Sequence, residues 1–125
     1  MPDYNLTPLV QPQFINIASA ALTFAPTGVV AVPANTVYRI LTARVVNVGA
    51  VPVALTIWRV PNGAAADAQH TMTPVTVIVP VANNTFPHFD LTVLWGATLS
   101  AGDAIWAQAG AANALVIVAD GAAIV

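Results

Sequence analysis

The chain contains no cysteine, no lysine and no glutamate. Without cysteine it forms no disulfide and offers no thiolate to a metal ion. Without lysine, and with a formal net charge of −2, it lacks the basic clusters that drive phosphate binding, so we expect no nucleic-acid partner. Charged residues make up only 6% of the sequence, against about 25% in ordinary soluble domains.

Long uninterrupted apolar runs are also missing, although 58% of the residues are hydrophobic. Polar residues such as Arg44, Asn47 and Arg59 break every run before the roughly 18 residues of a membrane-spanning helix, so we expect no membrane partner. One domain of 125 residues cannot bury this much apolar material in its own core. Because large exposed apolar patches usually mark contact sites, the composition predicts a homo-oligomer or docking in a larger assembly.

From about residue 21 onward, β-forming residues fill short runs between glycine, proline and asparagine signals. We expect eight strands, at residues 21–25, 28–32, 36–48, 52–60, 74–81, 85–95, 103–109 and 113–120. This spacing predicts an all-β fold, an antiparallel β-sandwich or jelly roll. Residues 62–70 are the one plausible place for a short helix or a long loop.

Residues 1–20 are rich in proline and show no sustained period. We expect them to form an extended N-terminal arm ahead of a β-sandwich domain at 21–125, with a disordered tail as the alternative. Removing such an arm should leave a folded domain that no longer binds its particle. The apolar anchors that would hold the arm on a neighbouring subunit are Tyr4, Leu6, Leu9, Phe14 and Ile17.

Neither face of the strand expected at 36–48 is cleanly polar. Strict alternation puts Arg39 on one side and Arg44 on the other, each among apolar neighbours. A sheet with one solvated face would alternate apolar and polar residues. We therefore expect another chain to cover the second face, with Arg39, Arg44 and Arg59 paired to aspartates across subunits.

Patterns for catalysis and metal binding are weak. The chain has no GxSxG motif, and only Ser19 and Ser100 could serve as a serine nucleophile. His88 and Asp90 fall on one side of a strand and could supply two metal ligands. With no third ligand apparent, a surface hydrogen-bonded pair or a polar contact between subunits is the favoured interpretation. We expect no catalytic residue, no cofactor and no metal.

The tryptophans and one turn have competing interpretations. Trp58, Trp95 and Trp106 suit a sugar-stacking platform, as in a carbohydrate-binding adhesin module. Packing in the core or at an interface is favoured, with Trp58 and Trp106 as candidate interface residues. Asp103 follows Gly102 and precedes an apolar strand, so we interpret the two as a turn in which glycine permits the bend and aspartate accepts local N–H bonds.

Two stretches resemble small virion proteins of tailed bacteriophages. They are VVAVPANTVYRILTARVVNVGAVPVALTIWRVPNG at 29–63 and TLSAGDAIWAQAGAANALVIVADG at 98–121. In that family a "VPA" turn opens a strand that ends in asparagine, and a "GD" hairpin follows later. The resemblance implies a non-enzymatic β-sandwich attached to a capsid or a tail, commonly as a cyclic oligomer.

We therefore expect a capsid cement or decoration protein that assembles with itself as a trimer or another cyclic homo-oligomer. It would be made in the host cytoplasm and reside in the virion, bound to a phage capsid or tail protein. The alternatives are a tail, head-fibre or baseplate component, and the carbohydrate-binding module.

Overall fold

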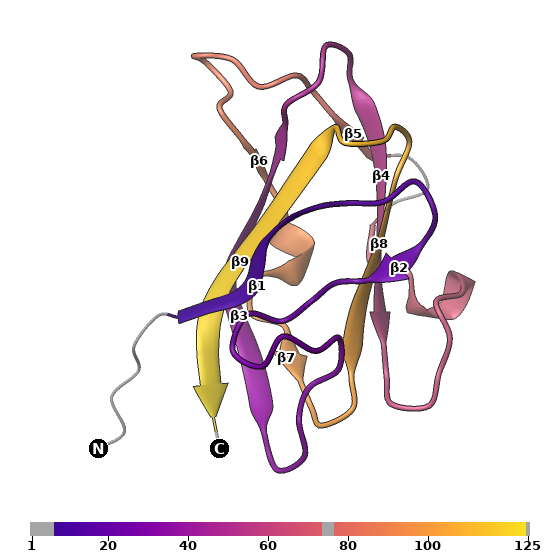
Figure 1. Cartoon of the computed structure of the whole chain (residues 1–125), viewed down its shortest axis with the longest axis vertical. Helices are drawn as coiled ribbons and strands as arrows, with labels where there is room; N and C mark the ends of the chain where they lie inside the picture. Colours follow the sequence, from indigo (N-terminus) through magenta and orange to yellow (C-terminus); the bar gives the residue numbers. More distant parts are fainter. Residues whose placement is uncertain (1–6, 74–76, 125) are drawn as a thin grey trace.

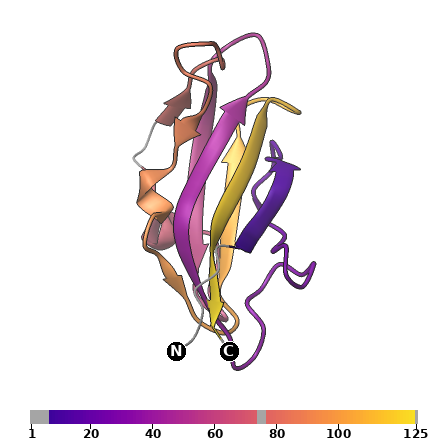
Figure 2. The same ribbon diagram turned by 90° about the vertical axis from the view of Figure 1, so that its left-hand side faces the viewer.

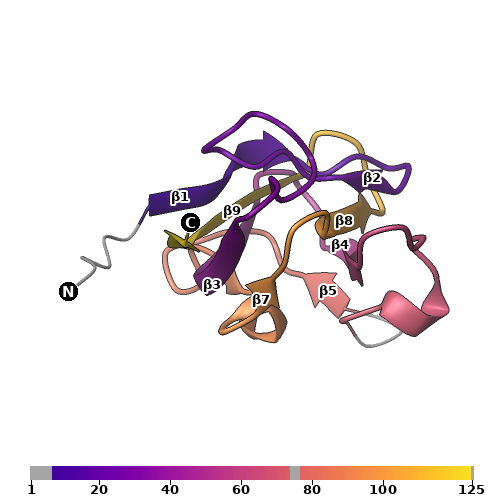
Figure 3. The same cartoon turned by 90° about the horizontal axis from the view of Figure 1, so that it is seen from below.

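Two antiparallel β-sheets pack face to face in the computed structural model, which describes residues 7–73 and 77–124 (Figure 1). The first sheet has the order β1(Thr7–Phe14), β9(Leu115–Ile124), β3(Val37–Asn47) and β6(Phe89–Asp90), and β7(Thr98–Leu99) also pairs with β3. The second sheet has the order β2(Ala20–Ala21), β8(Ala104–Ala109), β4(Val53–Val60) and β5(Val77–Val79). Seen from below, the two sheets form separate layers (Figure 3). The predicted all-β sandwich is confirmed.

The core lies between the layers and is built from alternate residues of the long strands. Ile40 on β3, Ile117 on β9 and Ile57 on β4 are fully buried there. Tyr38 packs edge-to-face on Phe24, with ring centroids 5.0 Å apart. The longest pairing joins β3 to β9, from Val37–Ile124 to Asn47–Leu115, and the two strands run side by side along the molecule (Figure 2).

A β-bulge in β3 changes which side chains face outward. Ile40 pairs with Gly121 and Thr42 with Asp120, so Leu41 is an extra residue on β3. A bulge advances the alternation by one residue. Arg39 before the bulge and Arg44 after it are therefore both exposed on the outward face of the sheet. The prediction from strict alternation, which put them on opposite sides, was wrong for this reason.

The N-terminal segment is part of the sandwich. β1 pairs along β9, from Thr7–Gly121 to Phe14–Val116, and forms the edge of the five-stranded sheet. Leu9, Val10 and Ile15 are buried in the core. The structure thus differs from the expected arm with a boundary at residue 20: the segment is extended, but Leu9 anchors it to its own chain. Tyr4 and Leu6 lie outside the described residues.

Three expected strands are largely absent from the described structure, and of residues 21–25 only Ala21 belongs to a strand, β2. Residues 28–32 follow a tight turn in which the Gly28 N–H donates to Phe24 O, and Gly28 has a φ of +70°. The 85–95 run yields only β6 and the 3-10 turn η2(Thr92–Leu94), while a second turn, η1(Ala68–His70), lies within 62–70.

No helix among the described residues has the length and hydropathy to span a membrane.

Candidate functional site

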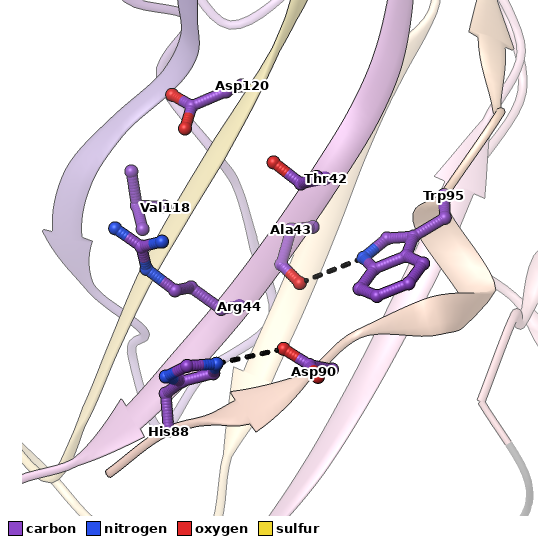
Figure 4. Close-up of a pocket in the computed structure, with 8 residues that line it drawn as sticks. All are labelled: Thr42, Ala43, Arg44, His88, Asp90, Trp95, Val118 and Asp120. Carbon is purple, nitrogen blue, oxygen red and sulfur yellow. Dashed lines mark hydrogen bonds and ion pairs between the residues drawn. The ribbon is translucent and has the colours of Figure 1, made fainter.

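A shallow depression of about 230 Å³ lies on the outward face of the five-stranded sheet (Figure 4). The register of three strands builds it, because Thr42 pairs with Asp120 on one side of β3 and Arg44 pairs with Asp90 on the other. We call it the Trp95 depression, and the residues that line it are Thr42, Ala43, Arg44, His88, Asp90, Trp95, Val118 and Asp120. It brings together one arginine, two aspartates, one histidine and one tryptophan.

His88 and Asp90 form a pair that lines this depression. The distance from His88 Nε2 to Asp90 Oδ1 is 3.1 Å, as expected for two residues that follow each other on one side of a strand. The predicted hydrogen-bonded pair is confirmed. In residues 7–73 and 77–124, no three His, Cys, Asp or Glu side chains gather into a group that could hold a metal ion.

Arg44 extends its guanidinium across the same face, between Asp120 and His88 in the view of Figure 4. Among the described residues Arg59 is the one arginine within ion-pair distance of a carboxylate, that of Asp103, so neither Arg44 nor Arg39 takes part in an ion pair. Arg39 instead lines a second groove with Leu41, Ala122 and Ile124. Arg59 Nη2 lies 3.8 Å from Asp103 Oδ2 of its own chain, and the expected pairing of the arginines across subunits stays a prediction.

The three tryptophans occupy two different faces. Trp58 on β4 and Trp106 on β8 are register partners on the four-stranded sheet, and both are half-buried. Trp95 follows η2 at the rim of the depression and is 44% exposed. Its indole N–H donates to Ala43 O at 3.2 Å, which fixes the orientation of the ring.

At one end of the sandwich, the described residues of the connections include exposed apolar side chains and no ionisable group. The connections 15–19, 48–52, 80–87 and 110–114 meet there, and the β3–β4 and β5–β6 connections form the top of Figure 1. We call this region the charge-free end. Its large apolar residues are each 48–62% exposed, and they are Phe14 at the end of β1, Ile17, Val48, Val51 and Phe86.

Asn47 holds the charge-free end together. Its buried side chain donates from Nδ2 to Val51 O at 2.9 Å and to Val79 O at 3.0 Å. Its Oδ1 accepts the Gly49 N–H at 2.9 Å. Sequence reasoning missed this residue; the available signal was a polar residue at the end of an apolar strand and two positions before a glycine.

Asp103 is a structural acid in a turn, as predicted. Gly102 has a φ of +85°, and Asp103 Oδ2 accepts the Ser100 N–H at 2.9 Å. The side chain is largely buried beside Arg59. Its second oxygen bonds a distant loop, which the sequence did not indicate.

Comparison of the chain with protein-family models, with curated proteins and with solved structures gives no match.

Sequence reasoning selected some residues of these surfaces and missed others. Arg44 was a candidate interface residue and Trp95 a candidate sugar platform, and the structure brings them into one depression. Asp120 was not selected, because its proximity to Arg44 depends on strand register. Among the other interface candidates, Phe14 and Ile17 lie at the charge-free end, far along the sheet from Arg39.

Proposed function

We propose that this chain is a non-enzymatic structural protein of a tailed-bacteriophage virion, a capsid cement or decoration protein that assembles as a cyclic homo-oligomer. The charge-free end carries the proposal. Burying exposed apolar area is worth about 25 cal/mol per Å², and the centres of protein interfaces are depleted in charge and enriched in aromatic residues. Phe86, Val51 and Ile17 give this end that composition.

The hydrogen bonds of Asn47 add a second reason. They join the β3–β4 turn to the end of β5, so hydrogen bonds hold the backbone that carries the exposed apolar side chains. An ordered surface loses less conformational entropy on association than a flexible one. The charge-free end is therefore suited to contact another protein without first folding.

The phage context rests on the resemblance of two stretches. The "VPA" segment at 32–34 precedes β3, which ends at Asn47. The "GD" turn at 102–103 leads directly into β8. These positions agree with the strand arrangement that the resemblance implies, and they support a β-sandwich attached to a capsid or tail.

Light scattering coupled to gel filtration tests the assembly. We expect the full chain to form an oligomer whose mass changes little with salt, because the contact contains few charges. The double variant Val51→Ser with Phe86→Ser should dissociate. Val29→Ser, at an exposed apolar position outside this end, is the control and should keep the oligomer. A wild-type chain that stays monomeric at high concentration would contradict the proposal.

Electron microscopy of phage particles purified from cells that produce the chain tests its location. Density on the outer capsid surface supports a cement or decoration protein. Density on the tail, head fibres or baseplate would support the alternative position. Particles of normal composition that lack the chain altogether would refute a place in the virion.

A further inference from the structure

We propose that the Trp95 depression binds one uncharged sugar ring of a glycan. The site lies on the outward face of the five-stranded sheet and shares no lining residue with the charge-free end, so the proposal stands independently of how the chain assembles. Three features of the depression support this proposal: an aromatic side chain of fixed orientation, both hydrogen-bond donors and acceptors, and a volume that suits a single sugar ring.

The platform is the indole of Trp95. Its N–H is already bonded to Ala43 O, so the ring cannot turn without losing that bond. With its only polar atom occupied, the indole presents an apolar ring at the rim of the depression (Figure 4), and Trp95 is 44% exposed. The C–H face of a pyranose is apolar as well, and stacking the two removes both from water.

The polar groups beside the platform match the edge of a sugar. Each sugar hydroxyl donates one hydrogen bond and accepts others. The carboxylates of Asp90 and Asp120 accept, the guanidinium of Arg44 donates, and all three line the depression. Because Arg44 forms no ion pair among the described residues, its donors are available to a ligand.

The charges in the depression oppose an anionic ligand. Two carboxylates face one guanidinium in the depression, and His88 is held by Asp90. An anionic ligand such as phosphate or an acidic sugar would meet like charge from Asp90 and Asp120, while a cation would meet Arg44. A neutral polyol is repelled by neither sign of charge, and its hydroxyl groups can bond to the donors of Arg44 and to the acceptors of both aspartates.

The volume limits the ligand to one ring. At about 230 Å³, the depression is smaller than the roughly 300–1,000 Å³ of pockets for drug-sized ligands. The site is open on the sheet surface, so neighbouring units of a chain would extend into solvent. A ligand of about a dozen heavy atoms in a shallow site binds with a Kd on the order of 1 mM.

Nuclear magnetic resonance of the full ¹⁵N-labelled chain tests the proposal. The probes are the methyl glycosides of glucose, galactose, mannose, rhamnose and N-acetylglucosamine, each added to about 50 mM to saturate a millimolar site. At least one should shift the Trp95 indole N–H and the backbone signals of 42–44, 88–90 and 118–120. The indole signals of Trp58 and Trp106, on the other sheet, should stay unchanged.

Variants then assign the binding to named side chains. Trp95→Ala and Asp120→Asn should each weaken binding about tenfold or more, whereas Trp106→Phe should leave it unchanged. If Trp95→Ala does not fold, Asp120→Asn and Arg44→Gln carry the same test, because both residues are on the surface.

Several outcomes would overturn the proposal. One is the absence of any shift with all five glycosides; another is a set of shifts confined to the four-stranded sheet. A response to inorganic phosphate or sialic acid that exceeds every neutral sugar would identify an anion site instead. If the resonances of residues that line the depression are protected from solvent in the oligomer and do not shift with any sugar, the depression is a contact between subunits instead.

Discussion

The carboxylate of Asp103 accepts the backbone N–H of Asn62 at 3.1 Å, across a sequence separation of 41 residues. The other oxygen of the same carboxylate accepts the Ser100 N–H, and the Asp103 carbonyl accepts the Val32 N–H. One residue thus connects the β7–β8 turn, the loop after β4 and the segment before β3. Its role is to hold three connections at the end of the sandwich opposite the charge-free end.

Removing this carboxylate should lower stability. Asp103→Ala leaves two backbone N–H groups without their acceptor, and we expect a loss of about 2–4 kcal/mol in the free energy of unfolding. Asp103→Asn keeps one acceptor oxygen and should lose less. Urea unfolding measures both. Asp67→Ala is the control, since Asp67 is exposed and its side chain contacts only the Gln69 N–H of η1 and His70. An Asp103→Ala variant as stable as the wild type would show that water replaces these bonds.

A methyl group at Gly121 should disrupt the five-stranded sheet. Gly121 lies in β9 between β1 and β3, and a Cβ there would collide with the backbone carbonyl of Arg39 and lie 2.8 Å from Leu9 Cδ1. Backbone cannot yield as a flexible side chain does, so Gly121→Ala should cost more than about 3 kcal/mol or prevent folding.

Thermal unfolding followed by circular dichroism measures this effect. Gly63→Ala is the matched control, because Gly63 has a φ of +80° but open space around it. It should cost only about 1 kcal/mol, from backbone strain. Equal melting temperatures for the two variants would mean that β9 moves aside easily.

The side chain of Asn47 is expected to support both stability and assembly. Asn47→Ala removes two donors and one acceptor from a buried site, for an expected loss of about 2–4 kcal/mol. Asn47→Asp should lose at least as much, because its carboxylate would face the carbonyls of Val51 and Val79 with no donor. Asn16→Ala, an exposed position at the same end, is the control.

Urea unfolding gives the stability of these variants, and light scattering gives their oligomeric mass. If Asn47 orders the charge-free end, Asn47→Ala should also weaken association under conditions in which the chain remains folded. If Asn47→Ala is less stable but associates as well as the wild type, Asn47 supports folding and has no role in assembly.

The sequence predicted the long interior strands because their apolar residues recur between clear turn signals, as in β4 and β8. It did not predict β1, since Pro8 and Pro12 oppose a strand in the middle of a sheet. β1 is an edge strand, where proline is tolerated because one side of the backbone needs no partner. The long-range pairing with β9 decides the structure of this segment, and no local pattern contains it.

Sequence patterns predicted even less of the Trp95 depression than of the fold. Arg44, Asp90 and Asp120 belong to three strands that are far apart in the sequence, and only the register of β3 with its two neighbours brings them together. The bulge at Leu41 also had to be known, because it turns Arg44 to the outward face. By contrast, the local pairs His88–Asp90 and Gly102–Asp103 were predictable, since each depends on residues within a strand or a turn.

The last prediction concerns β1. Removing residues 1–14 should unfold the chain, because Leu9 and Val10 are fully buried and the strand covers the edge of β9. Leu9→Ala should by itself cost about 2–5 kcal/mol through the lost packing and the cavity. Gln11→Ala, exposed on the same strand, is the matched control and should change the free energy of unfolding by less than about 0.5 kcal/mol. Circular dichroism and urea unfolding give both results. A truncated chain with a native-like spectrum would restore the interpretation of this segment as an arm that serves a neighbouring subunit.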